Sequence, residues 1–133
     1  MMTITFPGGV RVNAAIDAFD ILTDQPAENG GDNSAPSPFN LFLSSLGTCA
    51  GFFALRFCQQ RDLPTEGMKL TMESERNPES KRLERIEMIL TLPSGFPNRY
   101  HRPILRAIDQ CAVKKALLDP PEISVDLAQN DGM

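Results

Sequence analysis

Cysteines are the residues of this chain best suited to covalent chemistry. Cys49 lies inside the apolar run PSPFNLFLSSLGTCAGFFALRFC, and Cys111 lies inside AIDQCAVKKAL. Neither has the closely spaced Cys and His partners that a zinc site requires. A thiol beside a cation or a helix N-terminus ionises readily and becomes a nucleophile, whereas a buried thiol behaves as a small hydrophobe. From the residues alone, both interpretations stay open for Cys49 and Cys111.

The remaining cysteine and the cations near these thiols have simpler interpretations. Cys58 follows Cys49 by nine positions, about 900° of rotation on a helix, which places it on the opposite face, so we expect it in the core. Arg11 is the only basic residue before Cys49. It either faces water or reaches across to a helix, where it would favour a thiolate. Lys114 and Lys115 are expected to face solvent near a helix end.

Other kinds of catalytic site find little support in the sequence. His101 is the sole histidine and stands among arginines, which disfavours its protonation and metal binding, so we expect it at the surface. The chain has no Ser-His-Asp order, no phosphate-binding glycine loop and no zinc spacing, and we expect neither a cofactor nor a metal. A set of glutamates is expected on the wet face or turn of a hairpin: Glu73, Glu75, Glu79, Glu84 and Glu87.

Composition indicates one ordinary globular domain spanning residues 1–133. The mass is 14.7 kDa and the net charge is −4, so nucleic acid is not an expected partner. The N-terminus lacks the basic start and apolar stretch of a signal peptide, which predicts a cytoplasmic protein. Residues 39–55 carry no charge, but polar residues interrupt them and Arg56 follows, so no membrane association is expected.

The elements that must position the thiols begin with strands. Short β-branched runs at residues 3–6 and 10–16 predict a hairpin, and 18–23 predicts a third strand. Residues 24–37 are rich in Gly, Asn, Asp and Pro and predict a loop. Ser37 and Pro38 then predict the start of a helix over residues 38–61. Its apolar residues cover nearly every side, which predicts a buried, central helix, and a stripe of small residues predicts a second helix packed on it: Gly47, Ala50, Gly51 and Ala54.

Period-two alternation within residues 68–73 and again within 85–92 predicts an antiparallel hairpin with one wet face. Residues 103–118 are predicted to form a helix that carries Cys111 on its apolar stripe, and 123–127 a last strand. The expected fold class is therefore α+β, with the order βββαββαβ and helices against antiparallel sheets.

PSPFNLFLSSLGTCAG, followed later by DQCAVKKAL, resembles the OsmC/Ohr family of thiol-dependent hydroperoxide reductases. The similarity extends over nearly the whole chain. It includes the glycine-rich loop before the proline, the long helix with its cysteine, the Leu-Pro ending, the charged hairpin and the second cysteine. The resemblance implies an intertwined homodimer with active sites at the subunit interface and antiparallel sheets around the central helices.

The resemblance also implies roles for individual residues. Cys49 would attack an organic hydroperoxide, Cys111 would be the resolving thiol, and Arg11 would hold the thiolate and the peroxide oxygen. A dithiol reductant would then reset the cysteine pair. Four phenylalanines would line an apolar substrate pocket: Phe39, Phe42, Phe52 and Phe53.

Two departures from the family pattern keep a second function open. Reductases of the family usually have a glutamate after the helix-starting proline, where this chain has Phe39, and often a proline after the second cysteine, where it has Ala112. The alternative is an OsmC-like dimeric protein without peroxidase activity, acting as a small-molecule binding or interaction module.

Overall fold

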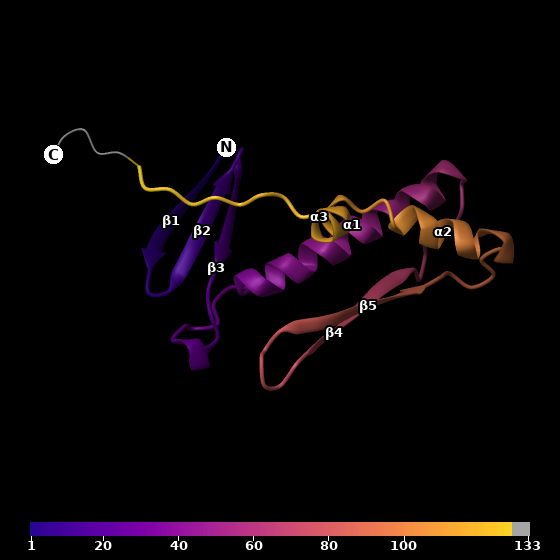
Figure 1. Ribbon diagram of the computed structural model, residues 1–133. Coiled ribbons are helices and arrows are strands. Elements are labelled where there is room, and N and C mark those ends of the chain that lie inside the picture. Colours follow the sequence, from indigo (N-terminus) through magenta and orange to yellow (C-terminus); the bar gives the residue numbers. More distant parts are fainter. Residues whose placement is uncertain (129–133) are drawn as a thin grey trace. The chain divides into compact units, whose positions relative to one another are not determined.

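The computed structural model describes residues 1–128 and has an α+β fold, as predicted (Figure 1). By contacts the chain divides into two compact units, one of residues 1–48 and 69–91 and the other of 49–68 and 92 onward, and each is described by itself. The elements in chain order are β1 (Met2–Gly8), β2 (Arg11–Ile16), β3 (Phe19–Thr23), α1 (Pro38–Gln60), β4 (Lys69–Arg76), β5 (Leu83–Thr91), α2 (His101–Ile108) and α3 (Ala112–Leu118), with single 3₁₀ turns at Ala27–Asn29 and Asn98–Tyr100.

In the first unit, β1, β2 and β3 form an antiparallel sheet in that order, which confirms the three predicted strands. Gly8 pairs with Arg11 across the tight turn that joins the first two strands. Arg11 therefore starts β2 one residue after the Gly8-Gly9 pair, at one end of the sheet.

The second sheet, also in the first unit, is the predicted β4–β5 hairpin. Leu70 and Met72 are half-buried while Lys69 and Glu73 are exposed, so the alternation in the sequence reports the two faces correctly. Met72 covers the α1 residue Gly47, where an added Cβ would lie 2.5 Å from the methionine sulfur. The space left by Gly47 is thus filled by the Met72 side chain and not by the backbone of a second helix.

Helix α1 begins and ends where its sequence signals predict. The Ser37 hydroxyl accepts a hydrogen bond from the Asn40 N–H at 3.2 Å, which caps a helix whose first residue is Pro38. After the helix ends at Gln60, the Arg61 guanidinium donates to the Phe57 carbonyl at 3.2 Å, satisfying one of its last acceptors. The predicted helix is confirmed within one residue.

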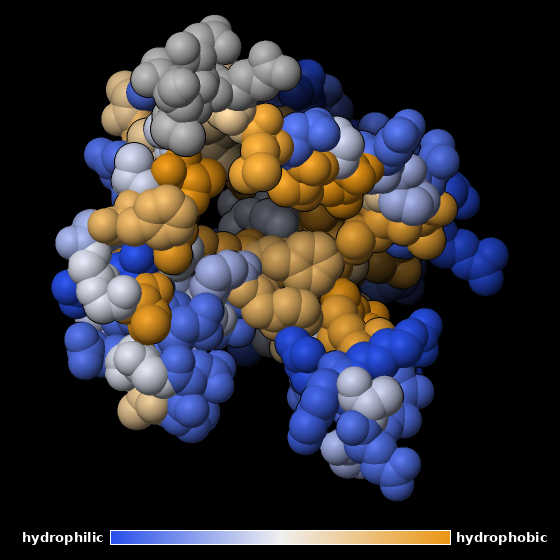
Figure 2. All heavy atoms as spheres, turned by 60° about the vertical axis from the view of Figure 1, so that its left-hand side comes forward, coloured by the Kyte–Doolittle hydropathy of each residue, from blue (hydrophilic) through white to orange (hydrophobic). Residues whose placement is uncertain are grey.

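The expectation that α1 is buried on all sides is not met in the single chain. One stripe of the helix is buried, and Figure 2 shows hydrophobic residues exposed over much of the face in view. Phe52 and Leu55 are 49% and 39% exposed. By length and composition α1 could also cross a membrane, but core helices share these properties. The buried stripe consists of Leu46, Ala50, Ala54, Phe57 and Cys58.

In the second unit, aromatic rings join α1 to the segment before α2. The Phe57 and Tyr100 rings meet edge to face with centroids 5.7 Å apart, and Phe96 lies 6.4 Å from Tyr100. Ile104 and Ile108 of α2 are buried in the same unit. These ring contacts join α1 to the 3₁₀ turn Asn98–Tyr100, so the predicted packing of a second helix on the small-residue stripe stays a prediction.

Two predictions about the C-terminal part are wrong. The single helix expected over 103–118 is two helices, because the chain turns at residues 109–111 between α2 and α3. Residues 123–127 form no strand, and Ile123, Val125 and Leu127 are 83%, 93% and 97% exposed. Alternation shows that a segment suits a sheet, but a strand forms only where a neighbour supplies the ladder hydrogen bonds.

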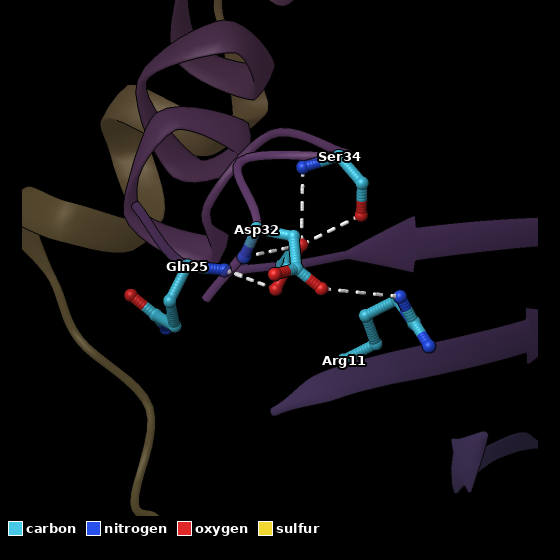
Figure 3. Close-up of polar contacts among 5 residues, drawn as sticks. Arg11, Gln25, Asp32 and Ser34 are labelled. Carbon is cyan, nitrogen blue, oxygen red and sulfur yellow. Dashed lines mark hydrogen bonds and ion pairs between the residues drawn. The ribbon is translucent and has the colours of Figure 1, made fainter. Parts of the chain in front are cut away.

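The loop between β3 and α1 is held together by the buried carboxylate of Asp24, which is 1% exposed. It accepts hydrogen bonds from the Ser34 hydroxyl at 2.6 Å, the Ser34 N–H at 3.0 Å, the Gln25 N–H at 2.8 Å and the Asp32 N–H at 3.3 Å (Figure 3). The loop also passes so close to itself at Gly31 that a Cβ there would collide with the Gln25 carbonyl. The Asp24 carboxylate thus holds in one conformation a loop whose composition alone does not determine its conformation.

These bonds, led by that of the Ser34 hydroxyl, lower the pKa of Asp24 to about 2, against the opposing effect of burial. Because the folded-state pKa lies below that of the unfolded chain, the carboxylate stabilises the fold above about pH 4 and loses this effect as the pH falls towards about 2. We expect Asp24→Asn to lower the free energy of unfolding at pH 7, measured in urea, and the difference from wild type to shrink through that range.

Glu28→Gln is the matched control, because it removes an exposed carboxylate from the same loop and should leave stability nearly unchanged. A stability difference between Asp24→Asn and wild type that persists undiminished at pH 2 would contradict the assignment.

Candidate functional site: a hydrogen-bonded thiol pair

Cys49 and Cys111, far apart in the sequence, come together in the second unit. Cys49 lies on α1 and is half-buried, and Cys111 directly precedes α3 and is fully buried. All three cysteines, which fall within the described residues, are thiols rather than disulfides. The structure therefore presents a reduced pair with one member accessible.

The Cys49 sulfur is surrounded by hydrogen-bond donors from the start of α3. The Val113 N–H, the Cys111 thiol and the Ala112 N–H all donate to it. Led by the Val113 bond, they lower the pKa of Cys49, while partial burial opposes them. Donors that bond to the charged form of a group stabilise it, so this arrangement favours the thiolate.

Cys111 has the opposite environment. Burial raises the pKa of its thiol, and the hydrogen bond that it donates to Cys49 raises it further. The Lys114 N–H donates to its sulfur at 3.4 Å, which offsets part of this effect. The pair is therefore asymmetric, since Cys49 ionises first and Cys111 supplies a proton-bearing partner.

The break between α2 and α3 creates this asymmetry. Cys111 is the N-cap of α3, so the N–H groups of the first turn have no partner within the helix and remain available to a sulfur. Lys114 pairs with Asp109 at 2.6 Å across the turn, rather than facing solvent alone as expected. In a continuous helix the Ala112 and Val113 N–H groups would bond to preceding carbonyls instead.

The sequence analysis missed Ala112 and Val113, whose contribution is made by the backbone and leaves no side-chain signal. A cysteine is not among the preferred N-cap residues, which are Ser, Thr, Asp and Asn. The turn-forming Asp109 ahead of Cys111 is the one sequence hint that a helix ends there.

Arg11 belongs to the first unit and faces the loop that Asp24 organises. Its guanidinium lies 3.7 Å from the Asp32 carboxylate, with the two side chains 36% and 81% exposed (Figure 3). Cys49 belongs to the second unit. The role of Arg11 towards the thiols stays a prediction.

The four phenylalanines predicted to line a substrate pocket form two pairs. Phe39 and Phe42 lie in the first unit with ring centroids 5.5 Å apart, and the Arg76 guanidinium covers the Phe39 ring at 3.9 Å. Phe52 and Phe53 lie in the second unit, 5.2 Å apart. Phe53, next to the thiol-bearing turn of α1, lines a cavity of the second unit.

The other titratable candidates lie outside the thiol pair. Cys58 is fully buried, and desolvation raises its pKa, as expected of a core thiol. His101 is exposed and stacks on Phe96 with ring centroids 6.0 Å apart. Among residues 1–128, no three His, Cys, Asp or Glu side chains gather to form a metal site.

Solved structures share this fold. A protein from Psychrobacter arcticus, described as an osmotic stress induced and detoxification response protein, superposes with a TM-score of 0.74 at 20% identity, over 86% of this chain and 85% of its own. An OsmC-like protein from Mycoplasma pneumoniae gives 0.71 at 17% identity, over 90% and 87%. The organic hydroperoxide resistance protein OsmC from Legionella pneumophila gives 0.56 at 15% identity, over 88% and 87%.

At these identities the structural similarity establishes the fold. A search of curated protein sequences gives no match. Residues 31–126, which carry both cysteines of the pair, match the family described as OsmC-like protein. The chain belongs to the OsmC-like protein family.

Proposed function

We propose that this protein is a thiol peroxidase that reduces organic hydroperoxides through Cys49 and Cys111. The observation that carries the proposal is the asymmetric thiol pair, in which backbone N–H groups favour the Cys49 thiolate and a proton-bearing Cys111 lies in hydrogen-bond contact with it. Structural relatives named as organic hydroperoxide resistance proteins, from Legionella pneumophila and Bacillus subtilis among others, support the choice of substrate class.

The proposed chemistry balances with a dithiol as the co-reactant. The Cys49 thiolate attacks the distal oxygen of the hydroperoxide, the O–O bond breaks, and the alkoxide leaves as an alcohol after taking a proton. Cys49 is then a sulfenic acid. The Cys111 thiol condenses with it to a disulfide and releases water, and an external dithiol reduces the disulfide by thiol exchange while being oxidised itself.

In this proposal Arg11 binds the peroxide oxygen and stabilises the charge that develops during attack. Asp32 takes the part of the glutamate that the family usually has where this chain has Phe39, because it is the carboxylate that contacts Arg11. Phe39, Phe42, Phe52 and Phe53 are proposed as apolar walls that favour an organic substrate over hydrogen peroxide.

We also propose that the active form is a homodimer. Large apolar residues of α1 and of the C-terminal segment are exposed in the single chain, including Phe52, Leu55, Ile123, Val125 and Leu127. Exposed apolar surface of this kind is typical of interfaces.

The central test is consumption of cumene hydroperoxide with dithiothreitol as reductant. Cys49→Ser should reduce the rate to that of the protein-free solution, because a hydroxyl does not ionise near neutral pH. Without reductant, wild type and Cys111→Ser should each consume about one equivalent of peroxide per chain. Wild type should end as the Cys49–Cys111 disulfide, whereas Cys111→Ser should end as the Cys49 sulfenic acid, which mass spectrometry distinguishes.

Cys58→Ala is the matched control, because it removes a thiol of the same helix that lies outside the pair, and it should keep the wild-type rate. Equal rates in wild type, Cys49→Ser and Cys111→Ser would reject the peroxidase and leave a binding or interaction module.

A second prediction concerns the N–H donors. Ala112→Pro should raise the pKa of Cys49, because proline removes one N–H that bonds to the sulfur while fitting the first position of α3. Cys111, with φ −51° and ψ 119°, already has the backbone conformation favoured before proline. The measurement is the pH dependence of iodoacetamide alkylation at Cys49, followed by mass spectrometry, whose midpoint should move upward.

Ala112→Ser keeps the N–H and should leave the midpoint in place. A downward shift in Ala112→Pro, or the same upward shift in both variants, would show that the backbone donor does not stabilise the thiolate.

A third prediction concerns Asp32. An exposed ion pair contributes about 0–1 kcal/mol to stability, so Asp32→Asn should scarcely change the free energy of unfolding. Without the Asp32 carboxylate, Arg11 is no longer oriented. The value of kcat/KM for cumene hydroperoxide should therefore fall by about fivefold, the equivalent of about 1 kcal/mol. Asp32→Glu, which keeps the carboxylate, should restore most of the activity. An unchanged kcat/KM in Asp32→Asn would remove Asp32 from the role of positioning residue.

A further inference from the structure

We propose that a cavity in the second unit, between the C-terminal half of α1 and α2, binds a small organic oxyanion that carries an aromatic or apolar body. The cavity has a volume of about 450 Å³, within the range of small-molecule pockets. Its polar lining residues are Arg56, Gln60, Arg61, Arg106 and Gln110. They present three guanidinium groups and two amides to one space.

No carboxylate is among the described residues that line this cavity. Asp109, the acidic residue next to Gln110, is paired with Lys114 at 2.6 Å and does not line it. The protein as a whole carries a net charge of −4, so three arginines that converge with no acidic partner among residues 1–128 form a local exception. A bound anion would supply the missing counter-charge.

Arg61 is held in place before any ligand arrives. Its guanidinium lies 3.7 Å from the centroid of the Phe57 ring and donates to the Phe57 carbonyl at 3.2 Å. These contacts use one face of the group and one of its N–H donors, so the remaining donors are available to an oxyanion. A preorganised guanidinium loses less conformational entropy on binding than a mobile one, which favours affinity.

The apolar part of the lining determines the rest of the ligand. Phe53, Phe57 and Pro103 line the same cavity, and Phe57 is buried while Phe53 is half-buried. An aromatic or apolar group can lie on Phe53 and Pro103 while its oxyanion faces the arginines, whose planar forks match carboxylate and phosphate oxygens. The class of ligand is therefore an aromatic or apolar phosphate or carboxylate, and the two head groups are separate arms of the test.

Neither Cys49 nor Cys111 lines this cavity, although Phe53, proposed above as a wall of the substrate pocket, does. Binding should therefore be independent of thiol chemistry and should not require the peroxidase activity proposed above. This separation allows one proposal to fail without the other.

The test is isothermal titration calorimetry of the full chain with phenyl phosphate, benzoate and inorganic phosphate. Phenyl phosphate or benzoate should bind more tightly than inorganic phosphate, and the affinity should fall with added salt. Arg106→Gln should weaken this binding by about tenfold, equivalent to about 1.4 kcal/mol. Gln60→Glu, which places a negative charge at the cavity, should weaken it at least as much.

Arg102→Gln is the matched control, because it removes the same charge from an exposed position one turn earlier on α2 and outside the cavity lining. It should leave the affinity within about twofold of wild type, and Cys49→Ser should bind as wild type does. Absence of binding of all three anions to wild type, or equal weakening in Arg106→Gln and Arg102→Gln, would overturn the proposal.

Discussion

The proposed chemistry depends on one interaction, the donation of hydrogen bonds by the first N–H groups of α3 to the sulfur of Cys49. A thiol inside an apolar helix would otherwise stay protonated, because burial disfavours the thiolate. The chain reverses this by ending α2 at Ile108 and restarting the helix after Cys111. The same turn places the Cys111 thiol against Cys49, so one backbone feature accounts for both the proposed activation and the proposed resolving partner.

In the first unit, the cation Arg11 is held by a different kind of arrangement. Asp24, buried and saturated with donors, fixes the loop, whereas the Arg11–Asp32 pair that depends on this loop is exposed. An exposed ion pair is weak and can be exchanged, which suits the proposed binding of a peroxide oxygen by Arg11. Rigidity is thus concentrated in Asp24, and Arg11 keeps the freedom that its proposed substrate-binding role requires.

Local signals were enough for much of the fold. Period-two alternation located the β4–β5 hairpin, and Ser37 with Pro38 located the start of α1, because these patterns report contacts made within a few residues. The break at 109–111 is held by local backbone bonds, such as that from the Cys111 N–H to the Ile108 carbonyl, which leave little signal in the sequence. The burial of α1 and the strand expected at 123–127 depend instead on partners distant in the sequence. The two thiols could be named from their motifs, but the donors that distinguish them are backbone groups and could not.

The net charge of the chain also does not predict where its positive side chains gather. An isoelectric point near 4.9 argues against long-range attraction of polyanions such as nucleic acid. It does not bear on a small anion, because screening confines charge interactions to about 8–10 Å at physiological ionic strength. A ligand between α1 and α2 meets Arg56, Arg61 and Arg106 within that distance. Spacing along two helices, rather than net composition, therefore determines which anions this protein can hold.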